Sequence, residues 1–118
     1  MTEILTGGVG KTEVADILSR LGLDGVAVRV SNDMDAATAL RTGRADYYLG
    51  TCHTGAGASL GLLVALLGTS QCHTFGRSVP TEDEVAALLS DGKRAFGFAL
   101  DQIDVLAPLM ARAIAAHG

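Results

Sequence analysis

The residues best suited to chemistry lie in a glycine-rich stretch that follows a short apolar segment. Residues 51–59 are Thr-Cys-His-Thr-Gly-Ala-Gly-Ala-Ser, and the segment before them ends in Tyr-Tyr-Leu. A cysteine at the start of a helix is favoured as the reactive thiolate, because free backbone N–H groups and the helix dipole stabilise negative charge. Glycines in the same stretch let the backbone approach a ligand closely. We therefore expect this stretch to form the functional site.

The stretch offers both catalytic and binding groups. Cys52 and His53 are the candidate catalytic residues. The candidate ligand-binding residues follow them directly: Thr54, Gly55, Ala56, Gly57, Ala58 and Ser59. The alternative role for Cys52 is that of a small buried hydrophobic residue or a neutral thiol, because free cysteines are commonly buried. The sequence leaves both roles open.

A second glycine-rich stretch, residues 7–12, resembles the second half of a phosphate-binding Walker A loop. Its sequence is Gly-Gly-Val-Gly-Lys-Thr, but Leu5 stands where the full motif requires glycine. We favour a simpler role, in which helix N-terminal amides and Lys11 hold a phosphate or carboxylate without hydrolysing a nucleotide. The other binding candidates in this stretch are Gly8, Gly10 and Thr12. A P-loop nucleotide site and a plain glycine turn are the alternatives.

Other polar residues follow predicted strands without forming a motif. Asn32 is placed to meet a ribose hydroxyl or to cap a helix, and Arg77 to pair with a ligand anion or to lie in solvent. Two Cys-His pairs, at residues 52–53 and 72–73, suggest a metal site. Adjacent residues on a strand point to opposite faces, however, and the two pairs belong near opposite ends of the sheet. We expect no metal and no cofactor.

Strand-like and helix-like segments alternate along the chain. Segments suited to strands occur at residues 4–6, 25–30, 46–49, 71–75 and 95–100, and glycines end the helical patterns at Gly22, Gly43, Gly68 and Gly92. Such alternation is typical of parallel strands joined by right-handed crossovers. We predict one α/β domain over residues 1–118, a doubly wound (flavodoxin-like or Rossmann-like) five-stranded parallel sheet with helices on both faces.

The predicted topology says where a ligand would bind. In open α/β sheets, ligands bind outside the carboxyl ends of the strands, where the strand order reverses. A flavodoxin-like order of 2-1-3-4-5 reverses between the first and third strands. The stretches at residues 7–12 and 51–59 would then be neighbours at this edge.

Composition excludes several classes of partner. The net charge is −4 and the nine Lys and Arg residues are scattered, so we expect no nucleic-acid binding. The longest apolar stretch, residues 56–68, is shorter than the roughly 18 residues that indicate a membrane span. Residues 1–5 lack a secretory pattern, which favours the cytoplasm.

The expected helix at residues 58–67 carries no charge, so it is either covered on all sides or the interface of a homodimer.

Over nearly its whole length the sequence resembles the YhfU-like family of small bacterial proteins, whose function is unassigned. The matching motifs are Ser31-Asn32-Asp33-Met34, Asp46-Tyr47-Tyr48-x-Gly50, Cys52-x-Thr54-Gly55-Ala56-Gly57-Ala58 and Lys93-x-Ala95-Phe96-Gly97. This resemblance implies no activity. Residues 7–12 are not part of the family's pattern, which weakens the alternative of a P-loop.

Over about ten residues the chain is also similar to the B-type ribose-5-phosphate isomerases and the related galactose-6-phosphate isomerases. Their loop, Cys-Gly-Thr-Gly-x-Gly-x-Ser, matches at Cys52, Thr54, Gly55, Gly57 and Ser59. The resemblance implies that Cys52 is the base and that the amides of residues 55–58 bind the enediolate oxygen. The Asp-His-Ala-Gly segment of those enzymes is replaced here by Gly7-Gly8-Val9-Gly10.

These observations lead to one expected function and two alternatives. We expect a small-molecule-binding protein for a phosphorylated or carboxylated sugar-type metabolite, and an aldose-ketose isomerase if it is an enzyme. The first alternative is a noncatalytic sensor or accessory subunit of a sugar transport or utilisation system. The second is a P-loop nucleotide binder.

Overall fold

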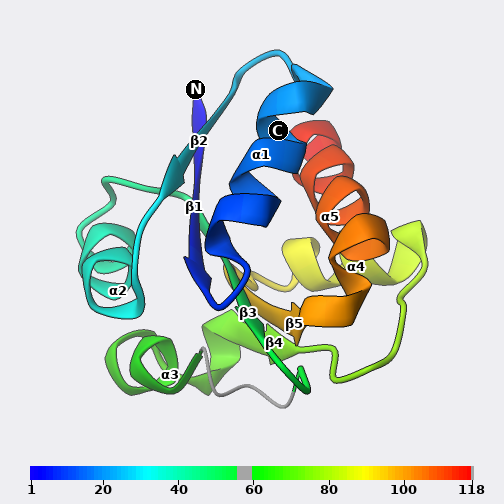
Figure 1. Ribbon diagram of the computed structural model, residues 1–118. Coiled ribbons are helices and arrows are strands. Elements are labelled where there is room, and N and C mark those ends of the chain that lie inside the picture. The colour runs from blue at the N-terminus through cyan, green and yellow to red at the C-terminus, as the bar shows by residue number, and fades with distance from the viewer. Residues whose placement is uncertain (56–59, 118) are drawn as a thin grey trace.

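The computed structural model describes residues 1–55 and 60–117, and five parallel strands form its centre (Figure 1). The strands are β1 (Thr2–Gly8), β2 (Val26–Val30), β3 (Tyr47–Cys52), β4 (Cys72–Thr74) and β5 (Ala95–Ala99). The helices are α1 (Lys11–Leu21), α2 (Asp33–Arg41), α3 (Gly61–Leu67), α4 (Glu82–Ser90) and α5 (Ile103–His117), with single 3-10 turns at Thr69–Gln71 and Leu100–Gln102. The predicted α/β class with a parallel sheet is confirmed.

The strand order is β2-β1-β3-β5-β4. It reverses between β1 and β3, as the expected order of 2-1-3-4-5 requires, but β4 and β5 have exchanged places. All five residues of β5 are buried, whereas β4 has three residues and ends at the exposed Thr74. A strand that is buried along its whole length belongs inside the sheet, and a short one is tolerated at an edge.

Helices cover both faces of the sheet (Figure 1). One core contains side chains of α1, α4 and α5 packed on strand residues that include Ile4, Leu49 and Phe96. The other contains side chains of α2 and α3 packed on Leu5 and Tyr48. Successive strand residues such as Ile4 and Leu5 therefore face opposite cores, as strand geometry requires. This is the doubly wound arrangement.

Local sequence rules account for several helix ends. The Asn32 side chain accepts a hydrogen bond from the Asp35 amide at 2.8 Å, and Thr81 and Glu84 form a reciprocal capping box at α4. The four glycines predicted to end helices, Gly22, Gly43, Gly68 and Gly92, all have positive φ.

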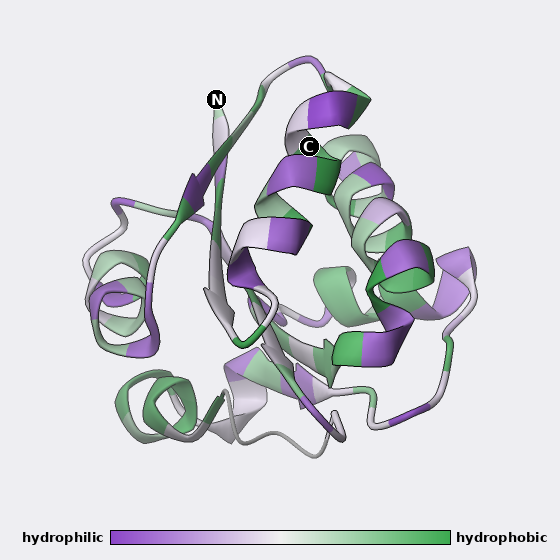
Figure 2. Cartoon of the chain, in the orientation of Figure 1, coloured by the Kyte–Doolittle hydropathy of each residue, from purple (hydrophilic) through white to green (hydrophobic). Residues whose placement is uncertain are grey.

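Helix α3 is uncharged but not covered on all sides. Leu63 is buried, whereas Gly61 and Ala65 are exposed and the remaining residues of the helix are half-buried. Figure 2 shows the helix in the colours of apolar residues along its length. None of the helices within residues 1–55 and 60–117 is long and apolar enough to cross a membrane.

Gly8 ends β1 in a conformation and a space that exclude other residues. Its φ is +84°, and a Cβ there would lie 2.0 Å from the carbonyl oxygen of Thr51 in β3. Residues 8 and 51 are register partners in the parallel pair. A side chain at position 8 would therefore be directed into the backbone of β3 at the carboxyl edge of the sheet.

We predict that Gly8→Ala destabilises the protein by about 3 kcal/mol or more, because left-handed strain adds to a clash with backbone. Gly92→Ala is the matched control, since Gly92 has φ +90° and nothing within 4 Å of the added Cβ. That substitution should cost about 1 kcal/mol. Urea unfolding of both variants measures the difference, and equal losses would show that the contact with Thr51 is unimportant.

Candidate functional site

The turn between β1 and α1 is short and tied to β3. Only Val9 and Gly10 separate the two elements. The carbonyl oxygen of Thr51 accepts from the Val9 amide at 3.1 Å, and the Thr51 hydroxyl accepts from the Gly10 amide at 2.7 Å. The same hydroxyl donates to the Gly7 carbonyl at 3.3 Å. Thr51, which is buried, thus fixes the turn against the neighbouring strand.

These bonds argue against the alternative in which residues 7–12 form a Walker A phosphate-binding loop. A phosphate-binding loop of that type surrounds the phosphate with backbone amides, over several residues between strand and helix. Here the amides of Val9 and Gly10 are used by Thr51, and two residues leave no loop to surround a phosphate. At Gly8 and Gly10 the space that a side chain would occupy is filled by Thr51, Leu100 and Ile103.

Helix α1 begins at this turn with an open N-terminus. Gly10 is its N-cap residue, and no side chain in the described part of the chain caps it. The first amides of a helix, here those of Lys11, Thr12 and Glu13, have no partner within the helix. The Lys11 and Thr12 side chains are exposed. The turn thus presents amides and a lysine at the point where the strand order reverses.

Cys52 ends β3 directly beside this turn. The residue is buried, with 9% of its surface exposed, and its Sγ accepts a hydrogen bond from the Gly55 amide at 3.1 Å. His53 and Thr54 are exposed, whereas Gly55 is buried against the Gly76 carbonyl. The other residues expected in this site, Ala56, Gly57, Ala58 and Ser59, lie outside the described residues.

Arg77 follows the edge strand β4 and contacts the loop that follows β3. It forms an ion pair with Asp101 and donates to the His53 carbonyl at 3.5 Å. Both side chains of the pair are more than half exposed, so the pair contributes little to stability. The contact instead brings Arg77 to the same edge as Cys52, as a ligand contact would require.

Asn32 stands apart from this group. It caps α2 and also donates to the Asp35 carboxylate at 3.0 Å. It follows β2, which pairs with the other side of β1. Lys11, Thr12, Cys52, His53 and Arg77 therefore lie at or just after the carboxyl ends of β1, β3 and β4, with one contact among these described residues, from Arg77 to the His53 carbonyl. Asn32 lies beside a hollow next to α2.

Cys72 and His73 lie at the start of the edge strand β4. Burial raises the pKa of the Cys72 thiol, partly offset by Lys93, and burial together with Lys93 lowers the pKa of the His73 imidazole. Both residues therefore favour their neutral forms. Among the described residues, no three His, Cys, Asp or Glu side chains gather as metal ligands would.

Two structural roles were not expected from the sequence. Thr51 belongs to the stretch expected to form the site, but its bonds to the β1–α1 turn were not expected, since a polar residue in an otherwise apolar strand is the only signal. The second role is that of Arg94. It donates to the carbonyls of Leu40, Ala45 and Asp46 and to the Gln71 side chain, at 2.9–3.2 Å. It thereby connects the end of α2 with the segments before β3 and β4, at the amino edge of the sheet. No sequence pattern indicates this role.

Fold and site together define a small doubly wound α/β protein with open loops at the carboxyl edge of its sheet. A family model described as a protein of unknown function, DUF2620, matches residues 2–114. The chain is also 30% identical over 112 residues to the uncharacterized protein YhfU of Escherichia coli K12, which covers 93% of this chain and 96% of that protein. YhfU of Shigella flexneri matches to the same extent. The chain belongs to this family, and the resemblance to YhfU is confirmed.

Proposed function

We propose that this protein binds a small metabolite through a phosphate or carboxylate at the carboxyl edge of β1 and β3. The observation that carries the proposal is the uncapped start of α1 at the reversal of strand order. Ligands of open α/β sheets bind at this reversal, and the positive end of a helix dipole attracts anions there.

Helices α2 and α4 differ from α1 in their caps. In each of them one first-turn amide donates to the cap side chain, Asn32 or Thr81. Helix α1 has glycine at the same position, so no cap side chain competes with a ligand for its amides. Helix α3 also lacks a side-chain cap within the described residues, but it has only seven residues. Lys11 adds a charge at that end, and Arg77 adds a second one beside the neighbouring loop. Sugar phosphates combine such an anion with hydroxyl groups that Thr12 and His53 would meet.

We predict that inorganic phosphate and ribose 5-phosphate shift the NMR signals of the Lys11, Thr12 and Glu13 amides. Lys11→Gln should weaken binding about tenfold, because a charge-assisted hydrogen bond is lost. Glu13→Gln should strengthen it, because a negative charge leaves the same turn. Arg20→Gln is the matched control at the other end of α1, and should have no effect.

Two results would contradict the anion site. Either phosphate leaves the three amide signals in place at millimolar concentration, or Arg20→Gln weakens binding as much as Lys11→Gln. The second result would mean that only the net charge of the protein matters.

An isomerase that uses Cys52 as a base is the second candidate. The observation that favours it is the Gly55 amide directed at Sγ, because a hydrogen bond to sulfur stabilises a thiolate. The same bond means that this amide points to the sulfur instead of a substrate oxygen. A sensor or accessory subunit would use the same loop for binding alone.

Alkylation of single-thiol variants separates these candidates. Because burial raises the pKa of Cys72, its thiolate is scarce at neutral pH, and in Cys52→Ser it should react slowly until the pH rises above the usual thiol range. A catalytic Cys52, measured in Cys72→Ser, should react faster at pH 7, and ribose 5-phosphate should protect it. Protection without fast reaction at pH 7 supports a sensor, and no protection rejects Cys52 as a base for this substrate.

We also propose that α3 is the contact surface of a homodimer. Its exposed side is uncharged, and contiguous apolar surface of this kind is typical of protein interfaces. Ala65 is exposed in the middle of this side, so a substitution there leaves the core intact.

We expect the wild-type protein to have twice the monomer mass of 12.1 kDa in light scattering, and Ala65→Glu to be monomeric. The buried charge would oppose association without unfolding the chain. Ala87→Glu, at an exposed alanine of α4, is the control and should remain dimeric. A monomeric wild-type protein, or a dimeric Ala65→Glu variant, would rule out this interface.

A further inference from the structure

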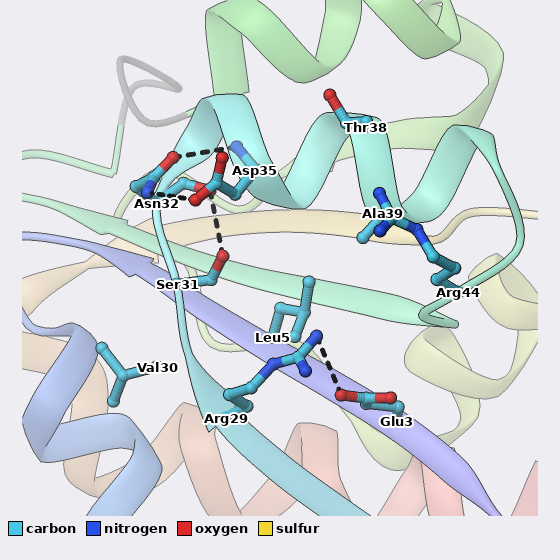
Figure 3. A pocket seen from close by; sticks show the side chains of 10 residues that line it. All are labelled: Glu3, Leu5, Arg29, Val30, Ser31, Asn32, Asp35, Thr38, Ala39 and Arg44. Carbon is cyan, nitrogen blue, oxygen red and sulfur yellow. Dashed lines mark hydrogen bonds and ion pairs between the residues drawn. The ribbon is translucent and has the colours of Figure 1, made fainter.

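A polar hollow lies beside α2, on the face of the sheet opposite α1. We call it the α2 groove. It has a volume of about 620 Å³ and runs between α2 and the strands β1 and β2 (Figure 3). The charged side chains that line it are Glu3, Arg29, Asp35 and Arg44. None of them belongs to the proposed anion site at α1.

The groove exists because α2 does not cover the edge strand. The core beneath α2 and α3 contains Leu5 of β1 and Tyr48 of β3, and among the described residues it contains none from β2. Arg29 of β2 is the register partner of Leu5, so its side chain lies on this uncovered face. Asp35, Thr38 and Ala39 follow helical spacing and form the opposite wall.

The two arginines extend into the groove from opposite sides (Figure 3). The Arg44 amide donates to the Ala39 carbonyl at 2.9 Å, which fixes the backbone at the end of α2. Its Nε donates to the Thr42 hydroxyl at 3.1 Å, and no carboxylate in the described part of the chain pairs with it. Arg29 pairs with Glu3 through one nitrogen, at 3.0 Å. Each guanidinium has five N–H donors, so several remain for an oxyanion.

The acidic residues of the groove are at its two ends. Asp35 lies in the first turn of α2, and one of its oxygens accepts from Asn32. Glu3 lies near the start of β1, beside Arg29. Two guanidinium groups and two carboxylates give the lining no net charge. The two carboxylates would repel a dianion such as a phosphate monoester. A molecule with one positive and one negative group instead finds an oppositely charged partner for each group.

We propose that the α2 groove binds a small zwitterion, a free amino acid, with its carboxylate on Arg44 and Arg29 and its ammonium group on Asp35 or Glu3. Arginine suits the planar carboxylate because its N–H groups match both oxygens. The Thr38 hydroxyl, which also belongs to this wall, already donates to the Met34 carbonyl at 3.1 Å, so the charged groups carry the recognition. This site is separate from the proposed function and does not depend on it.

The test is titration of the isotope-labelled full chain with each of the twenty amino acids, followed by NMR. At least one should shift the Arg44 Nε–H signal and the Asp35 and Thr38 amides in a saturable way. Arg44→Gln should weaken that binding tenfold or more. Arg41→Gln is the matched control, because Arg41 is exposed in the last turn of the same helix and does not line the groove.

Analogues of the best amino acid test the zwitterion itself. The hydroxy acid, which lacks the ammonium group, and the amine, which lacks the carboxylate, should each bind at least tenfold more weakly. A hydroxy acid that binds equally well overturns the proposal, as does an absence of saturable shifts with all twenty amino acids. Equal losses in Arg44→Gln and Arg41→Gln place the binding elsewhere. Lys11→Gln should leave amino-acid binding unchanged, which separates this site from the anion site.

Discussion

The contact between Thr51 and the β1–α1 turn organises the functional end of this protein. One buried threonine satisfies two backbone amides and one carbonyl of the neighbouring segment, through its hydroxyl and its own carbonyl. A buried amide without a partner costs about 1–3 kcal/mol, so the bond from the buried Gly10 amide to the Thr51 hydroxyl constrains the turn strongly. Gly8 permits the approach, because any side chain there would strike the Thr51 carbonyl.

This constraint fixes the direction of α1. With Val9 and Gly10 bonded to β3, the helix must begin at Lys11, directly beside the end of β3. Its first amides and the loop after Cys52 therefore open on the same edge. The loops of β3 and β4 meet there too, through the close contact of Gly55 with Gly76 and the reach of Arg77. The position of the proposed anion site therefore follows from the pairing of β1 with β3.

The α2 groove has a different physical origin. The sheet has two edges, and each is covered by fewer side chains than the centre. At the β4 edge the strand is short, whereas at the β2 edge the strand extends past the cover of α2 and carries Arg29 on the open face. Polar side chains fill the lining where apolar packing ends. The two proposed sites thus use the two features of a doubly wound sheet, its reversal point and its uncovered edge.

The sequence by itself determined the local elements and the fold class. Helix ends at Thr81 and Asn32, glycines with positive φ and the alternation of strand and helix depend on neighbours within a few residues, so pattern rules find them. Only the tertiary structure decided the exchange of β4 and β5, the burial of Cys52, and the roles of Thr51 and Arg94. The Thr51 hydroxyl bonds a residue 41 positions away, and Arg94 reaches a carbonyl 54 positions away. Such contacts depend on which strands become neighbours, and that choice is made by the packing of the whole sheet.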